Sequence, residues 1–163
     1  MSSRMARRLS HLDASGRVRM VDVGGKRVTR RVAVARGRVY MHRDTLRLLR
    51  DGRAPKGDVL ATAHVAGVMA AKRTAELVPL AHPIPLESVQ LAFTFDDEAC
   101  AVGIEAQVAT RARTGVEMEA LTAVTVAALT LYDMLKAVDR GMVMGEFALW
   151  EKRGGRSGAW TRA

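Results

Sequence analysis

The sequence predicts an α+β protein with a ferredoxin-like (split βαβ) fold, in which an antiparallel sheet has helices packed on one face. Two segments, residues 88–95 and 101–110, alternate apolar and polar side chains, as strands with one covered face do. Two longer Ala-rich segments, 58–80 and 114–141, have the length and composition of helices. From residue 27 onward the expected order is strand, helix, strand, strand, helix, strand, which is the order of a split βαβ fold.

The length of the chain, 163 residues, fits one domain of ordinary size. Hydrophobic residues make up 48% of the chain and aromatic residues only 4%, so we expect an aliphatic core. We predict a basic N-terminal arm at residues 1–17, a single ferredoxin-like domain at 18–152 and a mobile Gly-rich tail at 153–163.

The first part of the domain is rich in β-branched residues. Residues 18–23 and 27–41 are therefore expected to be extended. A short helix follows at 42–52, with its cap near Asp44 and its end at Gly52.

The first long helix follows a turn at residues 53–58 that contains Pro and Gly. We expect this helix, 58–80, to be capped by Asp58 and to end before Pro79. A loop at 81–85 then leads to the two alternating strands.

The second half of the fold begins with a hairpin turn at residues 96–99 between those strands. The second long helix, 114–141, is expected to end at Gly141, and residues 142–152 are expected to form the last strand.

The formal net charge of +9 favours an anionic partner such as a nucleotide, a nucleic acid or an acidic lipid. Most of the basic residues are Arg, and there are only five lysines: Lys26, Lys56, Lys72, Lys136 and Lys152. A genome that favours Arg codons would give this ratio. So would a chain that keeps Lys where a titratable amine is needed, because Arg does not lose its proton.

Several classes of site are excluded by the sequence. There is one cysteine, Cys100, so no internal disulfide can form, and no Cys/His cluster is present for zinc. No phosphate-binding G-x-x-x-x-G-K-[ST] loop and no G-x-S-x-G nucleophile elbow occurs. The start of the chain lacks the apolar run of a signal peptide, and the uncharged stretch 120–132 is too short to span a membrane. We therefore expect a cytoplasmic protein without a membrane partner; the absence of a nucleic-acid partner is expected from the comparison with an RNA-binding module below.

An acid and an amine, Asp133 and Lys136, stand near the end of the otherwise apolar segment 121–140. Their spacing places them on one face of a helix, together with Glu119 and Thr122. They could form a solvated ion pair near a helix end, which contributes little to stability. Alternatively, they could form a half-buried acid–base pair that transfers protons.

Other candidate residues occur in loops and near helix ends. His82 lies between prolines in a rigid loop, and Lys56 lies beside Gly57 before a predicted helix, where exposed backbone amides suit a phosphate. Lys72 lies on a predicted helix, where a solvated basic face is the simpler interpretation. Lys152 and Arg156 belong to the Gly-rich tail, which could fold over an anion or remain free.

Four stretches of the chain together resemble the cyclic pyranopterin monophosphate synthase family (MoaC). They are "LSHLDASGRVRMVDV", "DGRAPKGDVLATAHVAGVMAAKRTAELVPLAHPIPL", "TGVEMEALTAVTVAALTLYDMLKAVDRGM" and "LWEKRGGRSG", in this order from about residue 9 to 158. The resemblance covers nearly the whole chain, and its motifs are long and specific.

The resemblance implies a lyase of molybdenum cofactor biosynthesis that is active as a homohexamer, a trimer of dimers, with active sites at subunit interfaces. Its substrate would be the 3′,8-cyclised dihydro-GTP, which it would rearrange to cyclic pyranopterin monophosphate with release of diphosphate. No tightly bound cofactor and no protein-held metal are implied, although magnesium could accompany the substrate triphosphate.

The family's catalytic positions fall on Asp133, Lys136 and Lys56. Lys136 would act as general acid and base, Asp133 would orient it, and Lys56 would be a second proton carrier. The implied substrate-binding residues are Leu80, Ala81, His82, Glu117, Met118, Glu119, Lys72, Lys152 and Arg156.

The chain departs from the family pattern at four positions. Ala81 and Leu135 replace usual cysteines, so neither thiol can be essential here. Arg156 replaces a lysine, which leaves it able to hold a phosphate but not to donate a proton. His64 stands where an arginine is common.

Two other functions fit parts of the sequence. A basic RRM-like RNA-binding module would use Phe93 and Phe95 to stack bases, but these side chains fall on the strand face assigned to the core, and no RNP-type strand is present. A scaffold that only oligomerises would use the Ala- and Gly-rich helix as its contact.

Overall fold

The computed structural model describes residues 12–13 and 15–163. Its elements are β1 (Thr29–Tyr40), α1 (Arg43–Arg50), α2 (Val59–Lys72), α3 (Thr74–Leu77), β2 (Ser88–Asp96), β3 (Ala101–Ala112), α4 (Glu117–Leu135), β4 (Val143–Arg153) and β5 (Trp160–Thr161).

Most of the predicted N-terminal arm, residues 1–11 and 14, lies outside the described residues. Residues 18–23, predicted to be extended, form no strand except for one bridge between Val18 and Leu12.

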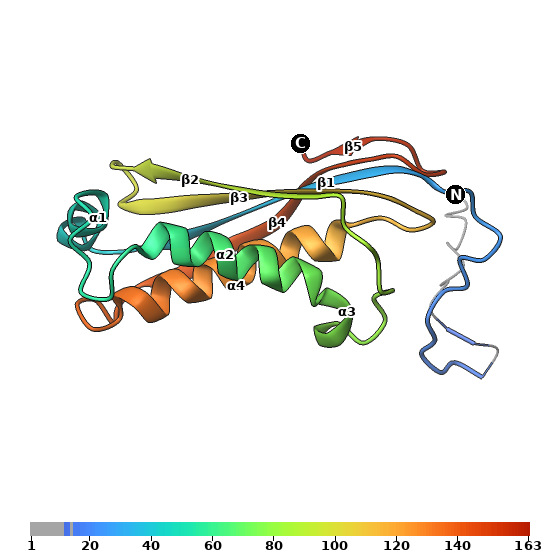
Figure 1. Cartoon of the computed structure of the whole chain (residues 1–163), viewed down its shortest axis with the longest axis horizontal. Helices are drawn as coiled ribbons and strands as arrows, with labels where there is room; N and C mark the ends of the chain where they lie inside the picture. Colours follow the sequence, from blue (N-terminus) through green and yellow to red (C-terminus); the bar gives the residue numbers. More distant parts are fainter. Residues whose placement is uncertain (1–11, 14) are drawn as a thin grey trace, which may run out of the picture.

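One antiparallel sheet forms a layer of the molecule, with strand order β2-β3-β1-β4-β5. The long helices α2 and α4 lie side by side below it, and α1 closes one end (Figure 1). Without β5, this strand order and the βαββαβ chain order are those of a split βαβ fold. The predicted α+β class, with an antiparallel sheet and helices on one face, is therefore confirmed.

The tail adds a feature that the sequence did not indicate. Residues Trp160 and Thr161 pair with Lys152 and Glu151 at the edge of the sheet, so part of the predicted mobile tail is a short strand. Strand pairing satisfies backbone groups that a free tail would leave to water.

The core between sheet and helices is aliphatic, as the composition predicts. Its fully buried side chains include Val39, Leu46, Ile104, Leu131 and Leu135. Phe93 and Phe95 pack against this core from β2, which leaves their faces occupied by protein rather than open for base stacking. The structure therefore does not favour the RNA-binding alternative.

The first long helix is shorter than predicted. α2 ends at Lys72 and a separate turn, α3, begins at Thr74. The Thr74 hydroxyl donates to the carbonyl oxygens of Ala70 and Ala71 at 3.2 and 3.0 Å, and such back-bonding competes with helix propagation. The predicted cap is present, because the Asp58 carboxylate accepts the backbone N–H of Ala61 at 3.0 Å.

The second long helix also differs from its prediction. α4 spans Glu117–Leu135 rather than 114–141, and the chain leaves the helix at Lys136, not at Gly141. The predicted cap of α1 near Asp44 is wrong too: the cap position is His42, and its side chain does not bond the helix. Both differences involve Asp139, whose carboxylate binds the backbone N–H groups of His42 and Gly141.

Helix α4 is the one helix among the described residues with the length and apolar composition of a membrane span. Half of its most apolar window is buried within the protein, as in a core helix that packs on a sheet.

The two long helices approach each other closely at Gly67. A Cβ atom placed there would lie 2.5 Å from Cδ2 of Leu91 and 3.1 Å from the carbonyl oxygen of Ala123. The small residue is therefore required by the packing of α2 between β2 and α4.

We predict that Gly67→Val lowers the free energy of unfolding by about 1–3 kcal/mol, because the added atoms overpack this contact. Urea denaturation at fixed protein concentration measures the change. Arg43→Val, at an exposed position of helix α1 away from this contact, is the control and should stay near the wild-type value. Equal stability of both variants would contradict the packing argument.

Candidate functional site

Three of the predicted catalytic side chains meet at the C-terminal end of α4. The Lys136 ammonium donates to Oδ1 of Asp133 at 2.6 Å, and the Lys56 ammonium donates to Oδ2 at 3.1 Å. Lys56 also donates to the backbone carbonyl of Asp133 at 3.0 Å, so the turn before α2 is fastened to α4. We call these three residues the Lys–Asp–Lys cluster.

The two ammonium groups control the charge of the acid. Hydrogen bonds from Lys136 first, and then from Lys56, hold the pKa of Asp133 below its usual range, so it is a carboxylate at neutral pH. The side chains of Asp133 and Lys136 are 54% and 50% exposed. Of the two interpretations that the sequence left open, the single chain therefore shows the exposed ion pair and does not by itself bury the two groups.

The predicted substrate-binding residues gather at the opposite end of α4, where the helix begins. They surround a cavity of about 690 Å³, large enough for a nucleotide-sized ligand. Its lining includes Leu80, Ala81, His82, Glu117, Met118, Glu119 and Arg156. We call this cavity the histidine cavity.

His82 is fixed in that cavity by a hydrogen bond to the N-terminal segment. Its Nε2 lies 2.9 Å from the carbonyl oxygen of Val21, and because a carbonyl only accepts, this nitrogen carries the proton. The remaining ring nitrogen, Nδ1, is then left as an acceptor. Val21 and Val23 line the same cavity, so the segment before β1 forms one of its walls.

Glu119 is a buried acid between two cavities. It lines the histidine cavity and also a second one of about 320 Å³, which it shares with His82 and Lys72. Glu119 is only 4% exposed. Burial raises the pKa of Glu119 to about 6, and repulsion from the nearby carboxylate of Glu117 adds to this effect. The predicted polar edge joining Glu119 to Asp133 is not observed, because Glu119 is covered while Asp133 is exposed.

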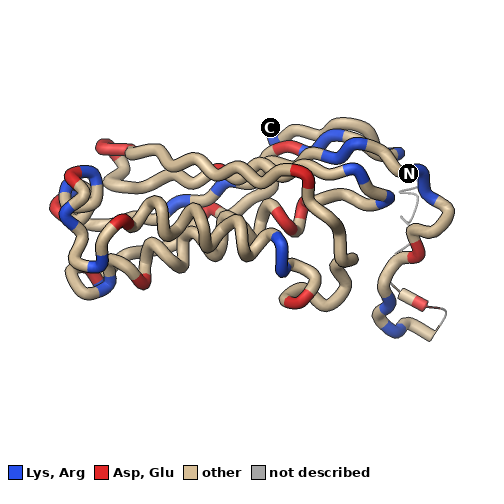
Figure 2. Tube along the Cα trace, viewed as in Figure 1, with Lys and Arg blue, Asp and Glu red and all other residues tan. Residues whose placement is uncertain are grey.

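A basic cavity of about 410 Å³ lies next to the histidine cavity and shares Lys26 and Arg156 with it. Arg27 and Arg31 complete its set of cations. Figure 2 shows basic residues gathered at this end of the sheet, where β1 begins and β4 ends. Four cations around one concavity suit a polyanion such as a triphosphate.

The glycines of the tail have a role in this arrangement. Gly155 has φ +78°, and a Cβ atom there would collide with the guanidinium of Arg31. The tail can therefore fold against Arg31 only with glycine at this position, and this brings Arg156 into the basic cavity.

Lys152 lies nearby on β4. Its ammonium is hydrogen-bonded to the Ser157 hydroxyl and lies 4.0 Å from Oε1 of Glu117. It is 24% exposed, so it is held between the tail and the start of α4 rather than free in solvent.

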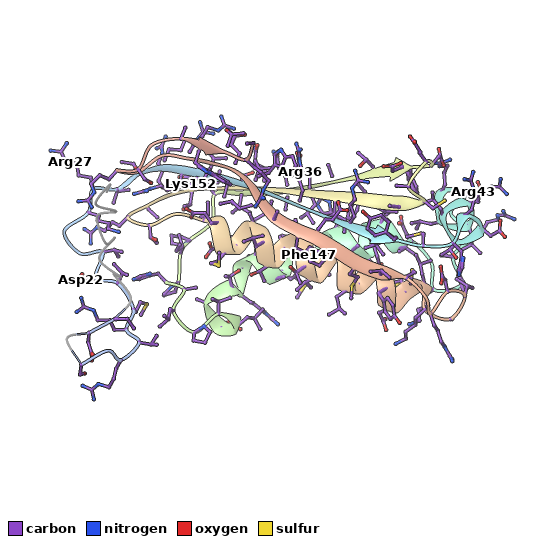
Figure 3. All side chains as sticks on the ribbon, turned by 180° about the vertical axis from the view of Figure 1, so that it is seen from behind. Asp22, Arg27, Arg36, Arg43, Phe147 and Lys152 are labelled. Carbon is purple, nitrogen blue, oxygen red and sulfur yellow. The ribbon has the colours of Figure 1, made fainter. Side chains whose placement is uncertain are left out.

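The predicted site residues thus form two groups at opposite ends of one helix. Fourteen residues separate Glu119 from Asp133, which is about 21 Å along a straight helix. In Figure 3, Arg43 of α1 marks the end with the Lys–Asp–Lys cluster, and Asp22 and Arg27 mark the other end. Within one chain, the two groups of residues therefore lie far apart along the helix.

Among the described residues, no group of three or more His, Cys, Asp or Glu side chains could hold a metal ion. The site residues are instead amines, guanidinium groups and single carboxylates. Such a set suits acid–base chemistry on an anionic substrate.

A family model described as the MoaC family matches residues 20–155. The chain belongs to the MoaC family. It is 63% identical to the cyclic pyranopterin monophosphate synthase of Thermomicrobium roseum over 154 residues, covering 94% of this chain and 93% of that protein. It is 60% identical to the synthase of the same name from Heliobacterium modesticaldum, over 94% of this chain and 97% of the relative. The synthase of Novosphingobium aromaticivorans is 56% identical over 95% of this chain and 98% of its own length.

The family resemblance drawn from the sequence motifs is therefore confirmed.

The sequence did not single out Lys26, Arg27 and Arg31 as members of a basic site. Their signal was present as a run of basic residues around the start of the first strand, but only the folded structure shows that they line one cavity with Arg156 of the tail.

We predict that Glu119→Gln makes the protein more stable than wild type at pH 8 but not at pH 4.5. The folded state raises the Glu119 pKa, so the folded protein holds its proton more tightly than the unfolded chain, and wild-type stability falls as pH rises toward about 6. The full difference above that pH is about 2 kcal/mol.

Urea denaturation at both pH values, at one protein concentration, measures this difference. Asp44→Asn replaces a carboxyl that is 94% exposed and is the control. A Glu119→Gln effect that does not change with pH would contradict the assignment of a buried, proton-holding carboxyl.

Proposed function

We propose that this chain is a cyclic pyranopterin monophosphate synthase of molybdenum cofactor biosynthesis. It is a lyase that converts 3′,8-cyclised dihydro-GTP to cyclic pyranopterin monophosphate and releases diphosphate. Its membership of the MoaC family and the names of its relatives support the reaction. One structural observation carries the proposal: the chain has the Lys–Asp–Lys cluster at one end of α4, and a nucleotide-sized cavity with an adjoining basic cavity at the other end.

We propose further that the active site is shared between protomers of a homohexamer. The Lys–Asp–Lys cluster is exposed and far from the histidine cavity of its own chain, whereas the reaction needs both around one substrate. An uncovered apolar strip on α2 and α4, which includes Val65, Met69 and Leu129, is available for contact with another copy. A symmetric contact through this strip would bring the cluster of one protomer to the cavity of its neighbour.

Each group of residues has a task in this composite site. His82, Met118 and Glu119, with Leu80 and Ala81, hold the purine-derived ring system. Lys72, Lys152 and Arg156 face the phosphates, together with the cations of the basic cavity. Their positive charge stabilises the diphosphate as it leaves.

The Lys–Asp–Lys cluster moves the protons. The reaction opens one ring and closes a cyclic phosphate, so it needs groups that give and take protons but no redox centre. Lys136 acts as general acid and base, Asp133 orients its ammonium, and Lys56 is a second proton carrier. The neighbouring protomer would exclude water from the exposed cluster and so strengthen these interactions.

We expect no tightly bound cofactor. A magnesium ion, if present, would be brought by the triphosphate of the substrate, because the described residues offer no cluster of ligands for it. The enzyme is expected to act in the cytoplasm, where a GTP-derived substrate is available.

The reaction is tested by incubating purified protein with the cyclised dihydro-GTP and measuring diphosphate and the pterin product together. Formation of both supports the proposal. Absence of both, with a folded protein and a relative of the family as positive control, would refute it.

We predict that Asp133→Asn and Lys136→Met each lower turnover by roughly 10²–10⁴-fold, because each removes a proton-transfer group or the carboxylate that orients it. Circular dichroism checks that the fold survives. Near wild-type turnover in either variant would remove that residue from the mechanism.

A mixture of two inactive variants tests the shared site. When Asp133→Asn and His82→Ala chains are unfolded together and refolded, we predict recovery of about a quarter of wild-type activity, the share of random composite sites with both intact residues. Each variant refolded by itself is the control. No recovery in the mixed oligomers would indicate a site contained within one protomer.

A further inference from the structure

Asp139 is a buried acid close to the catalytic cluster but outside it. Of residues 136–141, it is buried and the other five are exposed. Its side chain is 1% exposed. A carboxylate is costly to bury unless hydrogen bonds compensate it, so its partners indicate what it does.

The Asp139 carboxylate has three hydrogen-bond donors. Oδ2 accepts the backbone N–H of His42 at 2.9 Å and the hydroxyl of Thr45 at 3.1 Å. Oδ1 accepts the backbone N–H of Gly141 at 3.0 Å. Burial by itself raises the pKa of Asp139, but these hydrogen bonds outweigh it and hold the pKa below its usual range, so the group is ionised.

These contacts connect two segments that are distant in the sequence. On one side is the loop after α4, which starts with Lys136. On the other is the start of α1, which lacks a side-chain cap of its own. The negative charge of Asp139 at this helix start also interacts favourably with the helix dipole.

Each segment is connected to a lysine of the Lys–Asp–Lys cluster. Lys136 lies three residues before Asp139, and α1 leads through a short turn to Lys56. The two ammonium groups reach opposite oxygens of the Asp133 carboxylate. Lys136 is held near Asp133 by the last turn of α4, where its backbone N–H donates to the carbonyl of Tyr132. The position of α1 relative to the loop therefore bears on whether Lys56 can reach Asp133 at the same time.

We propose that Asp139 is a positioning residue for the Lys–Asp–Lys cluster: its buried carboxylate fixes the loop that holds Lys136 against the helix that leads to Lys56. This inference rests on the proposed function for its effect on turnover, but not for its effect on the two lysines. Asp139 does not touch the substrate. It acts only through Lys56 and Lys136.

The test is Asp139→Asn, which keeps the shape of the side chain but replaces one acceptor oxygen with an N–H₂ group that repels its former donor. The readout is the rate at which each lysine is acetylated by limiting acetic anhydride, measured by mass spectrometry. We expect the rates at Lys56 and Lys136 to rise roughly threefold or more, on the scale of losing one hydrogen bond. The other three lysines, Lys26, Lys72 and Lys152, are internal controls and should not change.

Turnover provides the second readout. Displacement of the amines is expected to lower kcat by roughly 10-fold to 100-fold with little change in KM, because the ring- and phosphate-binding residues lie at the other end of α4. Val108→Ala, which destabilises the core within β3 and leaves α1 and the loop after α4 untouched, is the control for a purely structural loss, and it should leave the labelling ratio of the lysines unchanged.

A milder pair of variants covers the case in which Asp139→Asn does not fold. Thr45→Val removes one donor to Asp139, whereas Thr45→Ser keeps it, so only Thr45→Val should increase labelling of Lys56 and Lys136. Unchanged labelling of both lysines in folded Asp139→Asn, or in Thr45→Val, would overturn the inference. If wild-type protein makes no pterin product, the proposed function fails, and the labelling still decides the role of Asp139.

Discussion

The length of α4 is the constraint on which the functional interpretation depends. A helix of 19 residues packed against the sheet is a rigid spacer, and it holds Glu119 near one end and Asp133 near the other. The same packing exposes the Lys–Asp–Lys cluster and buries Glu119. If the reaction needs both groups of residues around one substrate, as we propose, the opposite ends of two copies of the chain would have to combine to complete one active site.

The charged groups at the two ends of α4 differ in kind. At the start of α4, cations around the basic cavity suit a triphosphate, and the buried Glu119 holds its proton up to about pH 6. At the other end, Asp133 remains a carboxylate because two ammonium groups contact it. The substrate would therefore be bound through its charge at one protomer and rearranged by proton transfer at the next.

Much of the fold could be predicted from the sequence, because alternation and Ala-rich helices reflect local physics. The strand order and the Asp58 cap followed from such patterns. The ends of the helices did not follow from these patterns. The break at Thr74 comes from a local hydrogen bond of a buried hydroxyl to Ala70, which hydrophobic periodicity does not reveal. The loop after α4 is held by the hydrogen bond between Asp139 and His42, which are 97 residues apart in the sequence. The family motifs predicted the site residues, but only coordinates could show that Asp133 and His82 lie far apart in one chain. The cations Lys26 and Arg31 were missed because the tail that faces them is more than a hundred residues away.

The most direct test of a shared active site is a crystal structure of the Lys136→Met variant with the cyclised dihydro-GTP bound. If the site is shared, each ligand contacts His82 and Arg156 of one protomer and Asp133 of a different protomer. A ligand bound entirely by residues of one chain, or an Asp133 carboxylate that is distant from the ligand in every copy, would contradict it.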